Sequence, residues 1–112
     1  MSQPDPTALA AQHCVPCRGG VPPLAEDAIA RLLPHVPGWN VAGSHHLERT
    51  FTFADFKGAL DFVNRIGEVA EREGHHPDLE LGWGRVSVKI YTHKINGLTE
   101  SDFILAAKIS SL

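Results

Sequence analysis

The chain has 112 residues, of which 43% are hydrophobic and 21% charged, and its formal net charge is −3. These values are typical of a single small globular domain, and they predict no basic surface for direct nucleic-acid binding. No apolar stretch reaches the length of a membrane span, so we expect a cytoplasmic protein without a membrane partner.

Residues 1–23 contain several prolines and glycines without sustained periodicity, which predicts an irregular N-terminal arm ahead of one domain at residues 24–112. Cys14 and Cys17 form a CxxC pair in this arm, with His13 beside it. A closed zinc site needs four ligands and no second CxxC exists, and no βαβ pattern follows, as a thioredoxin-like redox motif would require. We therefore expect reduced cysteines in a segment that catalysis does not need.

Apolar residues at helical spacing predict a first helix from Leu24 to Leu33, which Pro34 ends. A short strand is expected around Trp39–Val41. A turn at Gly43–Ser44 then leads to a second strand, His46–Phe53, in which apolar and polar side chains alternate.

Asp55 is placed to cap a long helix that ends at Gly74, where glycine favours the left-handed C-terminal cap. One apolar stripe of this helix is expected to face the core, and its charged residues, Glu71 among them, are expected to face solvent. The stripe comprises Phe56, Ala59, Leu60, Val63, Ile66, Gly67 and Ala70.

Two alternating segments, Leu79–Trp83 and Val86–Ile90, flank Gly84-Arg85. A two-residue turn with glycine first is typical of a type II′ hairpin and predicts the register of the two strands. Counting outward from that turn pairs His76 with His93, at the roughly 4.5 to 5.5 Å Cβ separation of directly opposed residues.

The segment Thr99–Asp102 has the pattern of a capping box that opens a C-terminal helix. This helix has more apolar residues than one buried stripe needs, so we expect one of its faces to contact another copy of the chain. These residues are Phe103, Ile104, Leu105, Ala106, Ala107 and Ile109.

The predicted order is α-β-β-α-β-β-α. Hairpins imply antiparallel pairing, so the fold class is α+β: a four-stranded antiparallel sheet with three helices packed on one face.

The C-terminal part also carries an ordered polar set: Glu71, His75-His76-Pro77, Trp83, His93 and Asp102. Histidine has an unperturbed pKa of about 6.5, so several together can supply both a proton donor and a proton acceptor near neutral pH. Three histidines would also suit catalytic zinc, but adjacent residues of an extended chain point to opposite faces, so we expect no metal. The remaining histidines, His13, His35, His45 and His46, are interpreted as surface or core residues.

The spacing Glu71-x3-His75-His76-Pro77-x5-Trp83-x9-His93-x8-Asp102 resembles the motif of the pterin-4a-carbinolamine dehydratases. A weaker resemblance extends upstream, so that it covers roughly residues 22 to 110. It implies an α+β fold and a cofactor-free dehydration of 4a-hydroxytetrahydropterin, the product of an aromatic amino acid hydroxylase, to quinonoid dihydropterin. It also implies a homo-oligomer, specifically a tetramer.

By this resemblance His75 and His93 are the acid and base, in an order left open, and His76, Pro77 and Trp83 bind the substrate. Glu71 and Asp102 support the site, although a solvent carboxylate and a helix cap explain these two residues equally well. His75 and His76 must share one pocket, so we expect a bend between helix and strand.

A second class of function uses the same fold as a binding partner. Dehydratase-like families include a dimerisation cofactor of a homeodomain transcription factor and an assembly factor for Rubisco in carboxysomes. The intact histidine trio favours the enzyme, because an interaction module has no physical need for convergent imidazoles.

Overall fold

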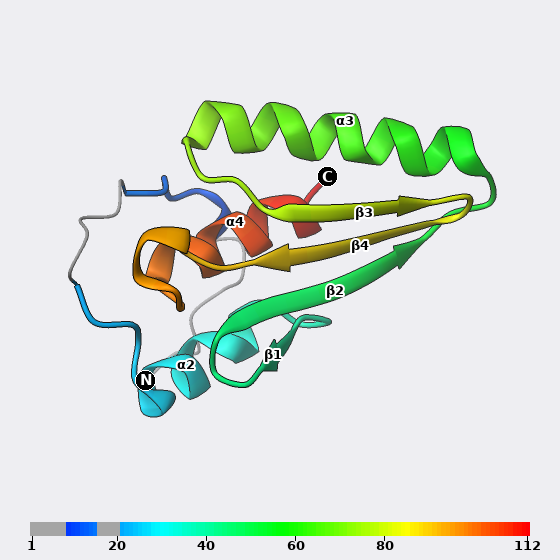
Figure 1. Ribbon diagram of the computed structural model, residues 1–112. Coiled ribbons are helices and arrows are strands. Elements are labelled where there is room, and N and C mark those ends of the chain that lie inside the picture. The colour runs from blue at the N-terminus through cyan, green and yellow to red at the C-terminus, as the bar shows by residue number, and fades with distance from the viewer. Residues whose placement is uncertain (1–8, 16–20) are drawn as a thin grey trace.

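The computed structural model describes residues 9–15 and 21–112, and its elements follow the predicted order (Figure 1). None of the described helices is long and apolar enough to cross a membrane. The elements are α2 (Glu26–Leu32), the 3-10 helix η1 (Leu33–His35), β1 (Asn40–Ala42), β2 (His46–Thr52), α3 (Phe56–Glu73), β3 (Asp78–Gly82), β4 (Arg85–Ile90), the 3-10 helix η2 (His93–Ile95) and α4 (Glu100–Ser110).

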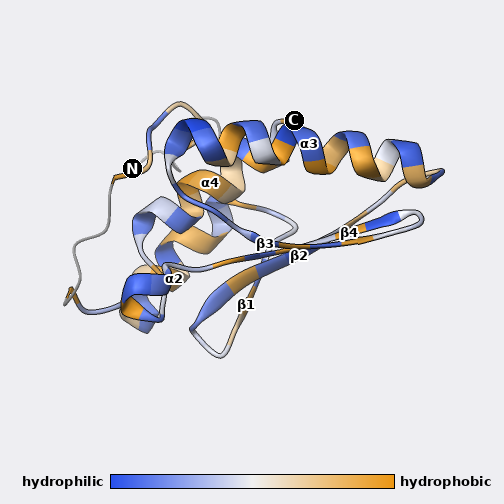
Figure 2. Cartoon of the chain, turned by 45° about the horizontal axis from the view of Figure 1, so that its top comes forward, coloured by the Kyte–Doolittle hydropathy of each residue, from blue (hydrophilic) through white to orange (hydrophobic). Residues whose placement is uncertain are grey.

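The four strands form one antiparallel sheet in the order β1-β2-β4-β3, which confirms the predicted α+β fold class. Helix α3 packs on β3 and β4, and α4 packs on β2 and β4. Both helices lie on the same side of the sheet (Figure 2). The core between these layers includes Leu47, Val86, Val88 and Ile90 from the strands. The opposite face of the sheet is left open and carries polar side chains.

Helix α3 begins and ends where the sequence predicts. The Asp55 carboxylate accepts a hydrogen bond from the Gly58 N–H at 2.8 Å, and Gly74 closes the helix in the left-handed conformation with φ of 65°. The predicted apolar stripe is only partly correct, because Phe56 and Leu60 are 44% and 38% exposed. The buried residues are Ala59, Phe62, Ile66, Val69 and Ala70.

The β3–β4 hairpin differs from its predicted register by two residues. Leu79 lies opposite Val88 and Gly82 opposite Arg85, so the loop is Trp83–Gly84. A shift of two keeps every side chain on its expected face, because the side-chain period of a strand is two. It does, however, remove the predicted opposition of the two motif histidines, and it leaves Trp83 69% exposed at the hairpin tip.

Gly84 explains the error. Its φ is not positive, so it does not supply the left-handed turn residue that the prediction assumed. Instead the Phe53 N–H donates to the Gly84 carbonyl at 2.8 Å, and a Cβ on Gly84 would lie 2.8 Å from the Phe53 carbonyl oxygen. The glycine is therefore required by the close approach of a neighbouring segment.

Helix α4 is buried on all sides within one chain, including Phe103, Ile104 and Leu105. Residues 9–15 cover part of it: Leu9 belongs to the core, and the Lys108 ammonium donates to the Ala10 carbonyl at 2.7 Å. Residues 9–15 therefore pack against the domain that was expected to begin near residue 24. The inference that an α4 face contacts another copy loses its basis. Cys17 lies outside the described residues.

The contact at Gly84 makes a prediction about stability. Gly84→Ala should destabilise the protein by about 1–3 kcal/mol, because the added methyl group overlaps a carbonyl oxygen that cannot move freely. Gly67→Ala is the matched control. It lies inside α3 with nothing within 4 Å of an added Cβ, and it should stabilise by about 0.5–1 kcal/mol. Urea unfolding of both variants is the measurement, and equal effects of the two substitutions would contradict the steric explanation.

Candidate active site

The imidazole of His75 is held by a buried carboxylate. His75 follows the last helical turn of α3, and Nε2 lies 2.5 Å from Asp102 Oδ1 on α4. The side chains are 13% and 0% exposed, respectively. Between Gly74 and the start of β3 at Asp78 the chain has neither helix nor strand, which is where the sequence analysis expects a bend.

The two oxygens of Asp102 have different partners. Oδ2 accepts from the Thr99 N–H at 2.8 Å, which completes the predicted capping box, and from the Thr92 hydroxyl at 2.9 Å. Oδ1 is left for His75. The predicted cap is therefore confirmed for Asp102, and its supporting role at the site stays a prediction that is compatible with the cap. With a carboxylate accepting at Nε2, the neutral His75 ring carries its proton there and presents the lone pair of Nδ1 as a proton acceptor.

The other two motif histidines are exposed, and each lies beside a carboxylate of its own. His76 Nε2 is 3.5 Å from Glu71 Oε2, and His93 Nε2 is 3.6 Å from Asp78 Oδ2. All four side chains are more than half exposed. Each imidazole of the trio thus has a separate carboxylate partner. Asp78 was not singled out as a site residue, although the strand alternation already placed it on the face of His76 and His93.

The position of His93 depends on a short closed turn. Thr92 and Gly97 form an isolated β-bridge around η2, with the Thr92 N–H donating to the Gly97 carbonyl at 2.8 Å. The Thr92 hydroxyl donates to Asp102. The Asp102 carboxylate therefore contacts both His75 and the residue that directly precedes His93. Sequence reasoning missed Thr92 because its spacing to Asp102 is typical of no known motif.

A row of rings begins at His93 and continues through Tyr91 to His45. The His93 ring packs on Tyr91 at a centroid distance of 4.2 Å, and Tyr91 packs on His45 at 4.5 Å. His45 Nε2 in turn contacts Asn96 Oδ1 at 2.8 Å. His45 was expected to be an ordinary surface or core residue, and no local pattern in the sequence connects it with His93.

The start of β3 and the end of β4 bring the histidines to one end of the sheet. Asp78 pairs with Lys89, so residues 75–77 and 91–93 leave the hairpin at the same end. Trp83 follows the far end of β3, and at about 3.3 Å per residue it lies on the order of 20 Å from His76. Within one chain the structure therefore does not bring Trp83 to the histidines, and its role in substrate binding stays a prediction.

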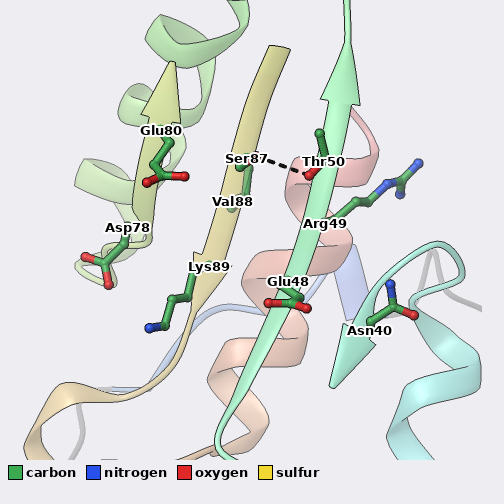
Figure 3. Close-up of a pocket in the computed structure, with 9 residues that line it drawn as sticks. All are labelled: Asn40, Glu48, Arg49, Thr50, Asp78, Glu80, Ser87, Val88 and Lys89. Carbon is green, nitrogen blue, oxygen red and sulfur yellow. Dashed lines mark hydrogen bonds between the residues drawn. The ribbon is translucent and has the colours of Figure 1, made fainter. Parts of the chain in front are cut away.

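A polar hollow of about 570 Å³ opens on the free face of the sheet, beside this end (Figure 3). Carboxylates from two strands and an ammonium group from a third point into it. Its lining residues are Asn40, Glu48, Arg49, Thr50, Asp78, Glu80, Ser87, Val88 and Lys89. Asp78 both lines the hollow and lies 3.6 Å from His93 Nε2.

A buried carboxylate outside the motif receives the N-terminal segment. The Glu73 side chain is 2% exposed, and it accepts from the Cys14 N–H at 2.9 Å and contacts His13 Nδ1 at 3.2 Å. The hydrogen bond from Cys14, aided by His13 and Lys108, lowers the pKa of Glu73 despite its burial. Burial, with Glu73 nearby, raises the pKa of the Cys14 thiol to about 11. Cys14 is therefore an unreactive neutral thiol near neutral pH.

No three His, Cys, Asp or Glu side chains in residues 9–15 and 21–112 are grouped so that they could hold a metal ion. That observation concerns only this part of the chain. The expected absence of a metal from catalysis stays a prediction, and treatment with a chelator tests it.

Comparison with known proteins shows the family. The family model for pterin 4 alpha carbinolamine dehydratase matches residues 22–112. The chain is 57% identical over 104 residues to a Rubrobacter xylanophilus protein named provisionally as a pterin-4-alpha-carbinolamine dehydratase, covering 93% of this chain and 97% of that one. A Methylococcus capsulatus protein with the same provisional name is 50% identical over 109 residues, or 96% of each chain. The chain therefore belongs to the pterin-4-alpha-carbinolamine dehydratase family, as its motif predicts.

Two solved structures share the fold. One, from Brucella melitensis, is described as a transcriptional coactivator/pterin dehydratase; it superposes with a TM-score of 0.74 at 34% identity, over 80% of this chain and 96% of that one. The other is a pterin dehydratase-like protein identified as a RuBisCO assembly factor in the alpha-carboxysome. It gives a TM-score of 0.57 at 20% identity, over 66% of this chain and 87% of that one. At that identity the likeness shows the fold alone.

The lowered pKa of Glu73 predicts an acid-sensitive contribution to stability. A folded-state pKa below the unfolded value of about 4.3 stabilises the protein above that value, and the stabilisation is lost as the pH falls through the folded pKa. The difference in free energy of unfolding between wild type and Glu73→Gln should therefore be larger at pH 6 than at pH 3. Glu68→Gln, at an exposed position of α3, is the control and should show no such change. Urea titrations at several pH values measure this, and a constant difference for Glu73→Gln would contradict it.

Proposed function

We propose that this protein dehydrates 4a-hydroxytetrahydropterin to quinonoid dihydropterin, with His75 and His93 exchanging protons and His76 holding the pterin. The supporting observation is the pair that His75 forms with the fully buried Asp102. A buried carboxylate that orients one imidazole nitrogen makes the other nitrogen a defined proton acceptor, as in other enzymes that use histidine as a base.

The dehydration needs one proton removed and one supplied. The proton leaves N5 of the pterin as the C4a–O bond breaks, and the N5=C4a double bond forms. The C4a hydroxyl takes up a proton and departs as water. His75 Nδ1 suits the base, because its Nε2 is occupied by Asp102. His93 suits the acid, because its Nε2 lies 3.6 Å from Asp78 Oδ2 and its exposure lets water return a proton to the ring after each turnover.

The exposed groups suit substrate binding. His76 and Glu71 lie at the same end of the sheet, and the polar hollow presents Asp78, Glu80 and Glu48 beside it. Carboxylates accept hydrogen bonds from the amino and ring N–H groups of a pterin. We therefore assign His76 and Pro77, next to it, to holding the substrate, with no cofactor and no metal in the reaction.

The alternative is an interaction module, as the two solved structures illustrate by their descriptions. The His75–Asp102 pair supports the enzyme instead, because a contact surface gains nothing from an imidazole that is 13% exposed and tied to a buried charge. An aromatic amino acid hydroxylase would supply the substrate in the same cell.

The proposal predicts distinct effects of the three histidines. His75→Ala and His93→Ala should each lower kcat by about 10² or more, whereas His76→Ala should mainly raise KM. Glu68→Ala, at an exposed position of α3 outside the motif, is the control and should leave both unchanged. The assay is the decay of freshly generated 4a-hydroxytetrahydropterin, with and without a chelator. Wild-type protein that leaves the spontaneous decay unchanged, while binding Rubisco or a transcription factor, would establish the interaction module.

We also propose a homo-oligomer, with a tetramer as the resemblance implies, but through a surface other than α4. Phe56 and Leu60 at the start of α3, and Leu81 and Trp83 at the end of β3, are exposed apolar residues. The start of α3 and the β3–β4 tip lie at the same end of the molecule (Figure 1), and β3 is an edge strand with an unpaired side.

Leu60→Glu should therefore shift the protein towards monomer in sedimentation velocity at micromolar concentration, because a buried charge at the contact would be costly. Lys57→Gln, an exposed change in the same helical turn, serves as the control. A monomeric wild-type protein, or an unchanged oligomer of Leu60→Glu, would remove this surface from consideration.

A further inference from the structure

The N-terminal strap, which we define as residues Leu9–Val15, is attached to α3 and α4 by polar contacts at three places. The Cys14 N–H donates to Glu73 Oε1 at 2.9 Å. The Val15 N–H donates to Ser101 Oγ at 2.9 Å, and this hydroxyl donates back to the Val15 carbonyl at 3.3 Å. The third place is the Ala10 carbonyl, which accepts from Lys108. Leu9 adds an apolar anchor in the core.

The attachment points are next to the proposed catalytic pair in sequence. Glu73 is the last residue of α3 and precedes His75 by two positions. Ser101 directly precedes Asp102 in the first turn of α4. The strap therefore joins the end of α3 to the start of α4, and the contact of His75 with Asp102 joins the same two ends. The Cys14 thiol, 3.5 Å from the Ser101 carbonyl, lies between them.

Apart from the strap, Asp102 has more hydrogen-bond partners in its own part of the chain than His75 has. Asp102 is held by Thr99 and Thr92 in its own part of the chain. His75 has no such local partners in the contacts described above beyond its backbone N–H on the Ala70 carbonyl, so its place depends on the end of α3. A catalytic base must be positioned to well within about 1 Å to work efficiently. A segment that keeps α3 against α4 therefore controls the distance between His75 and Asp102.

We propose that the strap is a positioning element for His75: through Glu73 and Ser101 it keeps the end of α3 against α4, so that the imidazole stays on Asp102. The inference rests on the proposed function for its kinetic consequence only. It replaces the expectation that catalysis does not need the arm, and it gives Cys14 a structural role through its backbone N–H.

The test compares strap variants in a Cys17→Ser background, so that Cys14 is the only thiol. Ser101→Ala combined with Glu73→Ala removes the side-chain contacts with Val15, the Cys14 N–H and His13 while keeping Leu9. It also removes the 3.9 Å pair of Glu73 with Lys108, which joins α3 to α4 without the strap. Deletion of residues 1–15 keeps that pair and so separates the two causes. In this variant we expect alkylation of Cys14 to become at least tenfold faster. We also expect the NMR signal of the His75 Nε2–H to be lost to solvent exchange, and kcat to fall about tenfold with KM changed less than twofold. Ser101→Thr, which keeps a hydroxyl, should restore the Ser101 contribution.

Two deletions complete the comparison. Removing residues 1–15 takes away the whole strap, whereas removing residues 1–7 keeps every described strap contact and is the matched control. Glu68→Ala is the control for a carboxylate lost from α3. Circular dichroism and urea unfolding confirm which variants remain folded, and the point variants carry the test if the longer deletion does not fold.

The outcomes separate the two proposals. A folded variant with fast Cys14 alkylation but wild-type kcat and an intact His75 signal would overturn the positioning role and leave the dehydratase untouched. A wild-type protein without dehydratase activity would overturn the proposed function. The His75 signal and the alkylation rate would then still decide whether the strap holds the pair.

Discussion

The buried carboxylate of Asp102 is the interaction on which the functional end of this molecule depends. An ionised group that is 0% exposed is tolerated only if hydrogen-bond donors surround it. Here the donors come from three places: the Thr99 backbone at the start of α4, the Thr92 hydroxyl after β4, and His75 after α3. Leaving such a group without one donor typically costs about 1–3 kcal/mol or more, so the three segments are held together by one charge.

This arrangement gives two histidines different surroundings at the same end of the sheet. His75 is 13% exposed and bound to a fully buried carboxylate, whereas His93 is 54% exposed and lies beside the solvated Asp78. Acid and base work in one site requires two groups whose environments differ. The distinction follows from topology, because residue 75 enters the helix layer while residue 93 follows a strand whose polar face is open.

The sequence predicted local structure well wherever a single residue carries the physical cause. Asp55, Gly74 and the box at Thr99–Asp102 stop or start helices through their own hydrogen bonds or backbone freedom, and all three predictions are confirmed. The predicted hairpin register is wrong because a glycine is required at position 84 by the close approach of the Phe53 carbonyl oxygen, which lies outside the hairpin. A rule that uses only the residues of the turn does not predict a contact with another segment.

The predictions of the apolar stripe on α3 and of the surroundings of α4 were partly wrong for a related reason. Both helices have apolar residues on several sides, and periodicity does not say which side meets the sheet or what covers the remainder. The cover over α4 came from residues 9–15, whose composition predicted an irregular arm. Among the residues that we propose for the site, Glu71, His75 and Asp102 were predicted from their spacing. Asp78, Thr92 and Glu73 act through contacts between segments that the motif does not include.

Adjacent residues of a strand point to opposite faces, whereas the family resemblance implies that His75 and His76 share one pocket. The position of these residues at the end of the sheet bears on this conflict. His75 and His76 point apart, one towards Asp102 on α4 and the other towards Glu71 on α3. They lie where the chain has left α3 and has not yet entered β3, so neither is confined to one face of the sheet. In the site that we propose, a pterin would contact His75 from the helix layer and His93 from the open face. The proposed site therefore needs no cross-strand pairing of histidines, only that β3 begins where β4 ends.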